Sequence, residues 1–189
     1  MPYVVVVTPP GEILPLDDVK RHLRVDHDDE DDLIEGLIQA AVATLDGPDG
    51  WLGRALGEQR LELRSNGFPV GCDGAIDLPL QPRTLVSVSY DDVAGSAHLV
   101  DPADCKLHGA GVYARSGFSW PSTACRPDSV RILYDAGTND VPKPVLAALK
   151  LMIGDLYRWR ETTAPIAGAS VPMSTTVEML LAPFRVWRG

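Results

Sequence analysis

The sequence feature that most constrains the fold is the apolar pattern from Val141 to Glu161, VPKPVLAALKLMIGDLYRWRE. Its large apolar residues recur at steps of one, three and four, so on a helix of about 3.6 residues per turn they share one broad face. These residues are Val145, Leu146, Leu149, Met152, Ile153, Leu156 and Tyr157. Pro142 and Pro144 suit only the start of a helix. The pattern predicts a long helix that must pack against other elements.

Two apolar patterns nearer the N-terminus supply partners for this helix. The first, Leu16–Leu23, carries two aspartates in its first turn, where carboxylates favour the positive end of the helix dipole. The second contains Leu33, Ile34, Leu37, Ile38, Ala41, Val42 and Leu45. Gly36 and Ala40 are small enough to allow a close helix crossing. Glycine and proline in residues 47–50 end this second helix.

Between these helices the hydrophobic period changes to two, which is typical of strands. The expected strands centre on Leu61 and Leu63; Ile76, Leu78 and Leu80; Val86, Val88 and Tyr90; and Val130, Ile132 and Tyr134, with weaker candidates at His98–Val100 and Val112–Tyr113. Short strands separated by glycine and proline predict a small antiparallel sheet, sandwich or barrel inserted between the helices.

The predicted fold class is therefore α+β, with a discontinuous helical bundle, an inserted β unit and an extended C-terminal arm. The bundle comprises residues 1–56 and 138–164, the β unit residues 57–137, and the arm residues 165–189. Within the arm, a short helix is expected over residues 174–181, capped by Ser174 or Thr175. The N-terminal MPYVVVVTPP lacks a charged leader and is expected to be an edge strand or arm, and not a signal peptide.

Composition excludes several classes of function. The formal net charge of −9 argues against nucleic-acid binding as the main activity, because such binding depends on Lys and Arg displacing counterions from phosphates. No apolar run approaches the roughly 20 residues needed to span a bilayer, so no membrane association is expected. Cys72, Cys105 and Cys125 have neither disulfide-framework nor zinc-site spacing and are interpreted as free thiols in a reducing compartment.

The acidic run from Asp26 to Asp32 is the strongest candidate for metal binding. An EF-hand loop counted from Asp26 needs Gly at its sixth position and Glu at its twelfth, but these are Asp31 and Leu37. The favoured interpretation is that Asp28 or Asp29 caps the second helix while the remaining carboxylates stabilise its dipole. A metal-dependent hydrolase using this run is a less favoured alternative.

No other catalytic pattern is present in the sequence. The histidines His22, His27, His98 and His108 lack metal-ligand spacing, and no serine lies in a nucleophile-elbow motif. The glycines form neither a dinucleotide fingerprint nor a P-loop. We therefore expect no enzymatic activity, no metal and no cofactor.

The C-terminal residues are the more informative feature. Phe184 and Trp187, flanked by Arg185 and Arg188, are of the residue types that dominate interface hot spots. Two interpretations stay open: the segment binds a partner, or it folds back on its own bundle.

An ordered series of short motifs resembles the head-to-tail connector (adaptor) proteins of long-tailed phages and bacterial gene transfer agents. The motifs span nearly the whole chain, are sparse between Gly71 and Pro127, and carry weight through their order. They are LDDVK at 16–20, LRVD at 23–26, the acidic cap with LI at 33–34, GFP at 67–69, WP at 120–121, YDAG at 134–137, VP at 141–142, LY at 156–157, RE at 160–161 and LLAPFR at 180–185.

This resemblance implies a non-enzymatic adaptor that forms a homo-oligomeric ring, typically of twelve copies, beneath the capsid portal protein. It implies a virion or phage-like particle assembled in the bacterial cytoplasm, with the ring linking the portal to the next neck or tail protein, a stopper or tail terminator. By position, the portal-binding candidates are Leu180, Leu181, Phe184, Arg185, Trp187 and Arg188.

Charge is consistent with such a role. DNA must pass through the ring without specific binding, and a net-acidic channel repels the duplex and lets it slide. A ring also needs a heterologous contact between two different faces of the chain. A tail-completion or stopper protein of the same neck region is the alternative.

Overall fold

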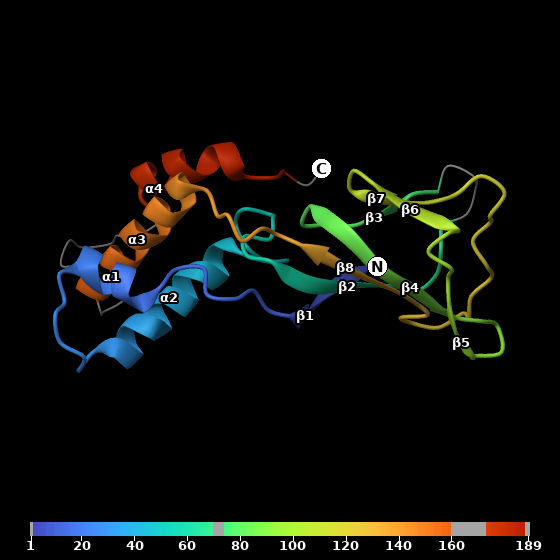
Figure 1. Cartoon of the computed structure of the whole chain (residues 1–189), viewed down its shortest axis with the longest axis horizontal. Coiled ribbons are helices and arrows are strands. Elements are labelled where there is room, and N and C mark those ends of the chain that lie inside the picture. The colour runs from blue at the N-terminus through green and yellow to red at the C-terminus, as the bar shows by residue number, and fades with distance from the viewer. Residues whose placement is uncertain (1, 70–73, 160–172, 188–189) are drawn as a thin grey trace, which may run out of the picture. The chain divides into compact units, whose positions relative to one another are not determined.

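The computed structural model describes residues 2–69, 74–159 and 173–187, and it is mixed α and β (Figure 1). The elements in chain order are β1 (Tyr3–Thr8), α1 (Leu16–Leu23), α2 (Asp31–Leu45), β2 (Gln59–Ser65), β3 (Ile76–Asp77), β4 (Pro82–Asp91), β5 (Ala97–Leu99), β6 (Cys105–His108), β7 (Gly111–Ala114), β8 (Val130–Ala136), α3 (Lys143–Arg158), α4 (Thr175–Leu181) and the 3₁₀ helix η1 (Ala182–Phe184).

The chain divides into two compact units, which we call the sheet unit and the helical unit. The sheet unit comprises residues 1–11 and 57–138, and the helical unit residues 12–56 and 139–189. In the described part of the chain, no helix has the length and apolar character that crossing a membrane requires.

The sheet unit contains two antiparallel sheets. The larger has the strand order β1-β2-β8-β4-β5, and the smaller has the order β3-β7-β6. Leu61 and Leu63 on β2 pair with Tyr134 and Ile132 on β8, and all four side chains are buried. Their common face forms the core of the unit, as the period-two pattern predicts.

Two details of the strands differ from the sequence expectation. Leu78 and Leu80 are buried but lie outside β3, because Leu80 and Gln81 both have positive φ (65° and 58°) and the chain turns there. The strand β6 was not expected from the sequence, since its alternating run CKLH is only four residues long and contains only two apolar residues. It pairs with β7 through Leu107 and Val112.

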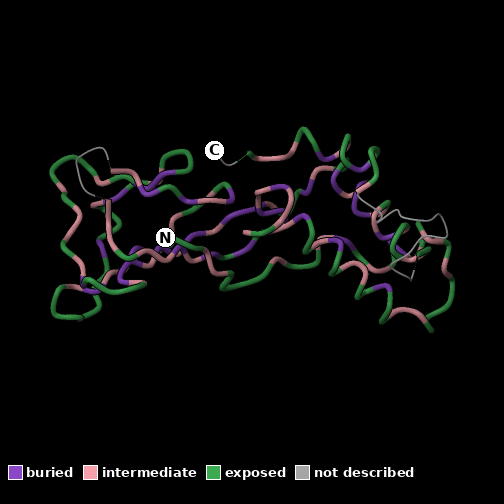
Figure 2. Tube along the Cα trace, turned by 180° about the vertical axis from the view of Figure 1, so that it is seen from behind, coloured by how far each residue is buried: buried purple, intermediate pink, exposed green. Residues whose placement is uncertain are grey.

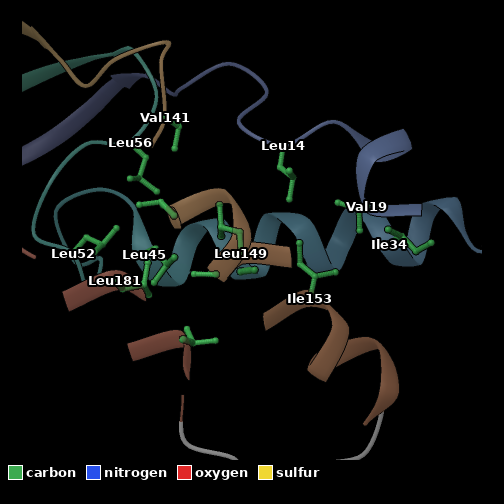
Figure 3. Packing of buried hydrophobic residues seen from close by; sticks show 14 residues of the cluster. Leu14, Val19, Ile34, Leu45, Leu52, Leu56, Val141, Leu149, Ile153 and Leu181 are labelled. Atoms are coloured by element: carbon green, nitrogen blue, oxygen red, sulfur yellow. The ribbon is translucent and has the colours of Figure 1, made fainter. Parts of the chain in front are cut away.

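The helical unit buries apolar side chains from all four α-helices. Figure 3 shows these side chains gathered between the helices. The buried cluster consists of Leu14, Val19, Ile34, Ala41, Leu45, Leu52, Leu56, Val141, Val145, Ala148, Leu149, Ile153, Val177 and Leu181. The stripe predicted on the long helix forms the α3 part of this core, except that Leu156 is 41% exposed.

Residues 1–11 lie with the sheet unit, whereas the sequence placed them with the helices. The reason is that β1 pairs antiparallel with β2, from Tyr3↔Arg64 to Thr8↔Arg60. Valine is a strong strand former, and the run of four valines finds its partner in a strand more than fifty residues away in the sequence.

The close helix crossing that Gly36 and Ala40 would allow is not made at these positions by the described residues. Both residues are exposed, and a Cβ added at Gly36 would meet no atom within 4 Å. The buried side of α2 is defined by Ile34, Ala41 and Leu45, and Gly36 lies on the opposite side of that helix.

Candidate functional site

The C-terminal residues fold back on the helical unit. Helix α4 begins after Ser174, whose side chain accepts a hydrogen bond from the Val177 N–H, as the predicted cap requires. Val177 and Leu181 are 1% and 0% exposed. The described part of the expected extended arm is therefore a packed helix, because its apolar residues at i and i+4 complete the core of α2 and α3.

After η1 the chain runs along the loop that follows α2. The Val186 N–H donates to the Leu52 carbonyl oxygen over 2.8 Å, and the Arg54 guanidinium donates to the Phe184 carbonyl over 3.4 Å. Gly53 has φ +64°, and a Cβ at this position would lie 2.6 Å from the Val186 carbonyl oxygen. A glycine is therefore needed at residue 53 for the two backbones to approach.

The Arg185 side chain lies between two indole rings. Its guanidinium carbon is 4.2 Å from the centroid of Trp51 and 3.9 Å from that of Trp187. Both distances are within cation–π range, and such contacts are worth about 0.5–1 kcal/mol each at exposed sites. We call Trp51, Arg185 and Trp187 the Trp–Arg–Trp surface. Trp187 is 75% exposed, so its ring is available to a partner.

The portal-binding candidates divide into two groups. Leu181 is fully buried, and Leu180 and Phe184 pack against the core, so these residues hold the segment in place. Arg185 and Trp187 form the outward part, and Arg188 lies outside the described residues. Sequence reasoning missed Trp51 and Gly53. A tryptophan between Gly50 and Gly53 is the local signal that marks this loop.

Replacing Gly53 by alanine should detach the C-terminal residues from the loop. The new Cβ would clash with the Val186 carbonyl, and positive φ alone disfavours alanine by about 1–2 kcal/mol. We expect faster tryptic cleavage after Arg185 and a change in tryptophan emission. The matched control is Gly36→Ala, which meets no atom and should stabilise α2 by about 0.5–1 kcal/mol. Equal cleavage rates for the two variants would contradict the docking of this segment.

The acidic run forms the exposed connection between α1 and α2, coloured mostly as exposed in Figure 2. Lys20 Nζ lies 2.7 Å from Asp28 and 2.6 Å from Asp31. These contacts raise the pKa of Lys20, while the hydrogen bond from Lys20 lowers the pKa of Asp28. The Tyr157 hydroxyl donates to Glu30, which ties this connection to α3.

Neither Asp28 nor Asp29 caps α2, so that prediction is wrong. The N-cap residue is Glu30, without a side-chain capping bond, because Asp28 is instead paired with Lys20. Asp31 and Asp32 do occupy the first turn, as expected. Among residues 2–69, 74–159 and 173–187, no group of three His, Cys, Asp or Glu side chains is placed to hold a metal ion.

Two cysteines are free thiols, Cys105 buried and Cys125 exposed. Burial raises the pKa of the Cys105 thiol, which makes it a poor nucleophile at neutral pH. Cys72 lies outside the described residues.

Asp91 is the buried carboxylate among the described residues of the sheet unit. The two oxygens of Asp91, whose side chain is 4% exposed, accept from Arg126 over 2.6 Å and from Arg131 over 2.7 Å. The hydrogen bond from Arg126 is the main cause that lowers the pKa of Asp91, with Arg131 adding to it. The backbone of Asp91 also accepts from Ala124 N–H and donates to the Ser129 carbonyl. The carboxylate and the backbone of Asp91 therefore bind the loop before β8 and the start of that strand.

Residues 14–88, less than half of the chain, match the family described as Phage gp6-like head-tail connector protein. This match confirms the resemblance to head-to-tail connectors that the ordered motifs indicate. Among curated proteins, no sequence matches the chain.

Solved structures with the same fold come from gene transfer agent (GTA) particles. A chain in the neck of an empty GTA particle, computed with C6 symmetry, is 23% identical with a TM-score of 0.77; the match covers 99% of this chain and 97% of that one. A chain of a native GTA virion is 24% identical with a TM-score of 0.76, over 98% and 96%. A chain in the neck of a native GTA particle, computed with C12 symmetry, is 21% identical with a TM-score of 0.71, over 99% and 97%.

Proposed function

We propose that this protein is a structural adaptor in the neck of a phage or gene-transfer-agent particle, assembled in the bacterial cytoplasm. The observation that carries the proposal is the agreement of fold over almost the entire length of neck chains. The connector-family match over residues 14–88 supports it from the sequence. In this role the chain performs no chemical reaction and needs no cofactor.

The adaptor acts as a ring of identical copies between the portal and the next neck or tail protein. Neck structures that contain similar chains were computed with C6 and C12 symmetry, which is the arrangement expected of a ring. Twelve copies around one axis require a heterologous contact, in which one face of a copy meets a different face of the next.

The acidic residues of the ring repel the phosphates of DNA that passes through it. Each copy has a formal net charge of −9, and residues 26–35 contain seven acidic residues and no Lys or Arg. Asp26, Asp29, Asp32 and Glu35 are exposed. Repulsion between such a surface and phosphates opposes adhesion, so the duplex passes through an acidic channel without specific binding.

The Trp–Arg–Trp surface binds the portal. Aromatic and arginine side chains gain most on desolvation at interfaces, and Trp187 has the exposure that such a contact needs. Leu180, Leu181 and Phe184 contribute by fixing the segment to the helical unit. A rigid surface loses less entropy on binding than a free arm does.

Replacing Trp187 by alanine tests this assignment. Deleting residues 180–189 would also remove the buried Leu181, so a point variant separates binding from folding. We expect Trp187→Ala to fold normally and to lower the yield of tailed particles at least about tenfold, leaving filled heads without tails, because hot-spot aromatics are worth about 2 kcal/mol or more. The measurement is electron microscopy of particles.

The matched control is Met179→Ala, which changes a side chain that is 73% exposed on α4. It should give normal numbers of tailed particles. If Trp187→Ala particles acquired tails as efficiently as this control, the portal-binding role of the surface would be refuted.

A further inference from the structure

Among the strands that the structure describes, β1 has a partner on one side of its backbone only. It lies at the end of the strand order β1-β2-β8-β4-β5 and pairs with β2. Its apolar side chains are also partly uncovered: Tyr3 is 46%, Val6 40% and Val7 50% exposed. A strand edge of this kind is a template for a further strand.

Natural sheets usually protect such an edge with charge, proline or a very short strand. The opposite side of this sheet follows that rule, because β5 has only three residues and β4 begins with Pro82 and Arg83. None of the six residues of β1 is charged or proline, and residues 2–11 contain no charged side chain at all. The β1 edge is therefore the unprotected side of the sheet.

The backbone of β1 is also already fixed in an extended conformation by its contacts within the sheet unit. The register with β2 is regular from Tyr3 to Val6 and shifts only between Val6 and Thr8. The Tyr3 hydroxyl donates to Asp128 over 2.6 Å and fixes the start of the strand. Since the backbone is already extended and fixed, an incoming strand would not have to order it.

We propose that β1 accepts an extended segment from the neighbouring copy of this chain, so that strand addition joins adjacent subunits. The inference rests on the proposed ring. Copies with a net charge of −9 repel one another, and an edge free of charge is where two of them can meet without added repulsion. Pairing of β1 with a different element of the neighbour gives the heterologous contact that closes a ring.

Hydrogen exchange of the β1 backbone amides tests the proposal. The amides of residues 3–8 are followed by mass spectrometry in the free monomer and in purified particle necks. We expect exchange at the outward-facing amides to slow at least about tenfold in the neck. A neck ring whose β1 amides exchange as fast as in the monomer would overturn strand addition and leave the adaptor function intact.

If the necks contained no ring of this chain, the proposed function and this inference would both be overturned. Twofold dimers closed by β1 pairing with β1 would also overturn the inference, because that contact uses the edge without forming a ring.

Placing a charge on the β1 edge tests the proposal independently, with ring formation as the measurement. Val6→Lys should leave the melting temperature of the monomer within a few degrees and reduce ring formation at least about tenfold, since lysine is a natural edge blocker. Val93→Lys makes the same change at a turn residue that is 76% exposed and should assemble normally. Equal assembly of the two variants would overturn the proposal. If Val6→Lys failed to fold, the exchange experiment on the unaltered chain would decide.

Discussion

Replacing Leu181 by alanine is expected to lower the free energy of unfolding by about 2–5 kcal/mol, the range for removing a fully buried leucine side chain. The loss arises because Leu181 lies in the core between α4 and the other helices, where a cavity would remain (Figure 3). For a chain of this size the melting temperature should fall by about 5–15 °C. Thermal unfolding followed by circular dichroism measures it.

Met179→Ala is the matched control, since it shortens an apolar side chain two residues away on the same helix. Met179 is 73% exposed, so the change should stay within about 0.5 kcal/mol. The pair decides between the two sequence interpretations of the C-terminal segment. A free arm would make both substitutions neutral, whereas a docked helix makes only the first one costly.

The helices were the predictable part of the fold. Periodicity identified α1 at its observed bounds, Leu16–Leu23, and identified the faces of α2 and α3, because apolar spacing depends only on local geometry. Which elements pack against these apolar faces depends on contacts between residues far apart in the sequence. Val177 and Leu181 give α4 an apolar side that must pack against another element. The local sequence does not indicate that this element is the helical unit of the same chain.

The candidate site was predictable only in part for a related reason. Arg185 and Trp187 stand out by residue type, but the second indole comes from Trp51, more than a hundred residues earlier. The contact depends on Gly53 permitting a close backbone approach. A single sequence gives no signal that joins these positions. The same holds for Lys20 on α1. Asp28 lies just before α2 and was expected to cap it, but its carboxylate accepts a hydrogen bond from Lys20 instead.

Loss of the Asp91 carboxylate should strongly destabilise the sheet unit. In Asp91→Asn, the guanidinium groups of Arg126 and Arg131 lose the buried anion that both contact, and the loop before β8 loses its main tie. Removing one partner of a buried ion pair is strongly destabilising, and we expect the melting temperature at pH 7 to fall by about 10 °C or more. The exposed Asp77→Asn serves as the control and should be neutral.

The pH dependence identifies the charge as the cause. Because the two arginines lower the pKa of Asp91 in the folded state, its ionised form stabilises folding above the unfolded-state pKa of about 3.9. That contribution is lost as pH falls through the lower, folded-state pKa, where Asp91 becomes protonated. The gap in melting temperature between the unaltered chain and Asp91→Asn should therefore be constant above pH 5 and shrink below pH 4. A gap that persisted undiminished at low pH would show that shape, and not the paired charge, makes this residue necessary.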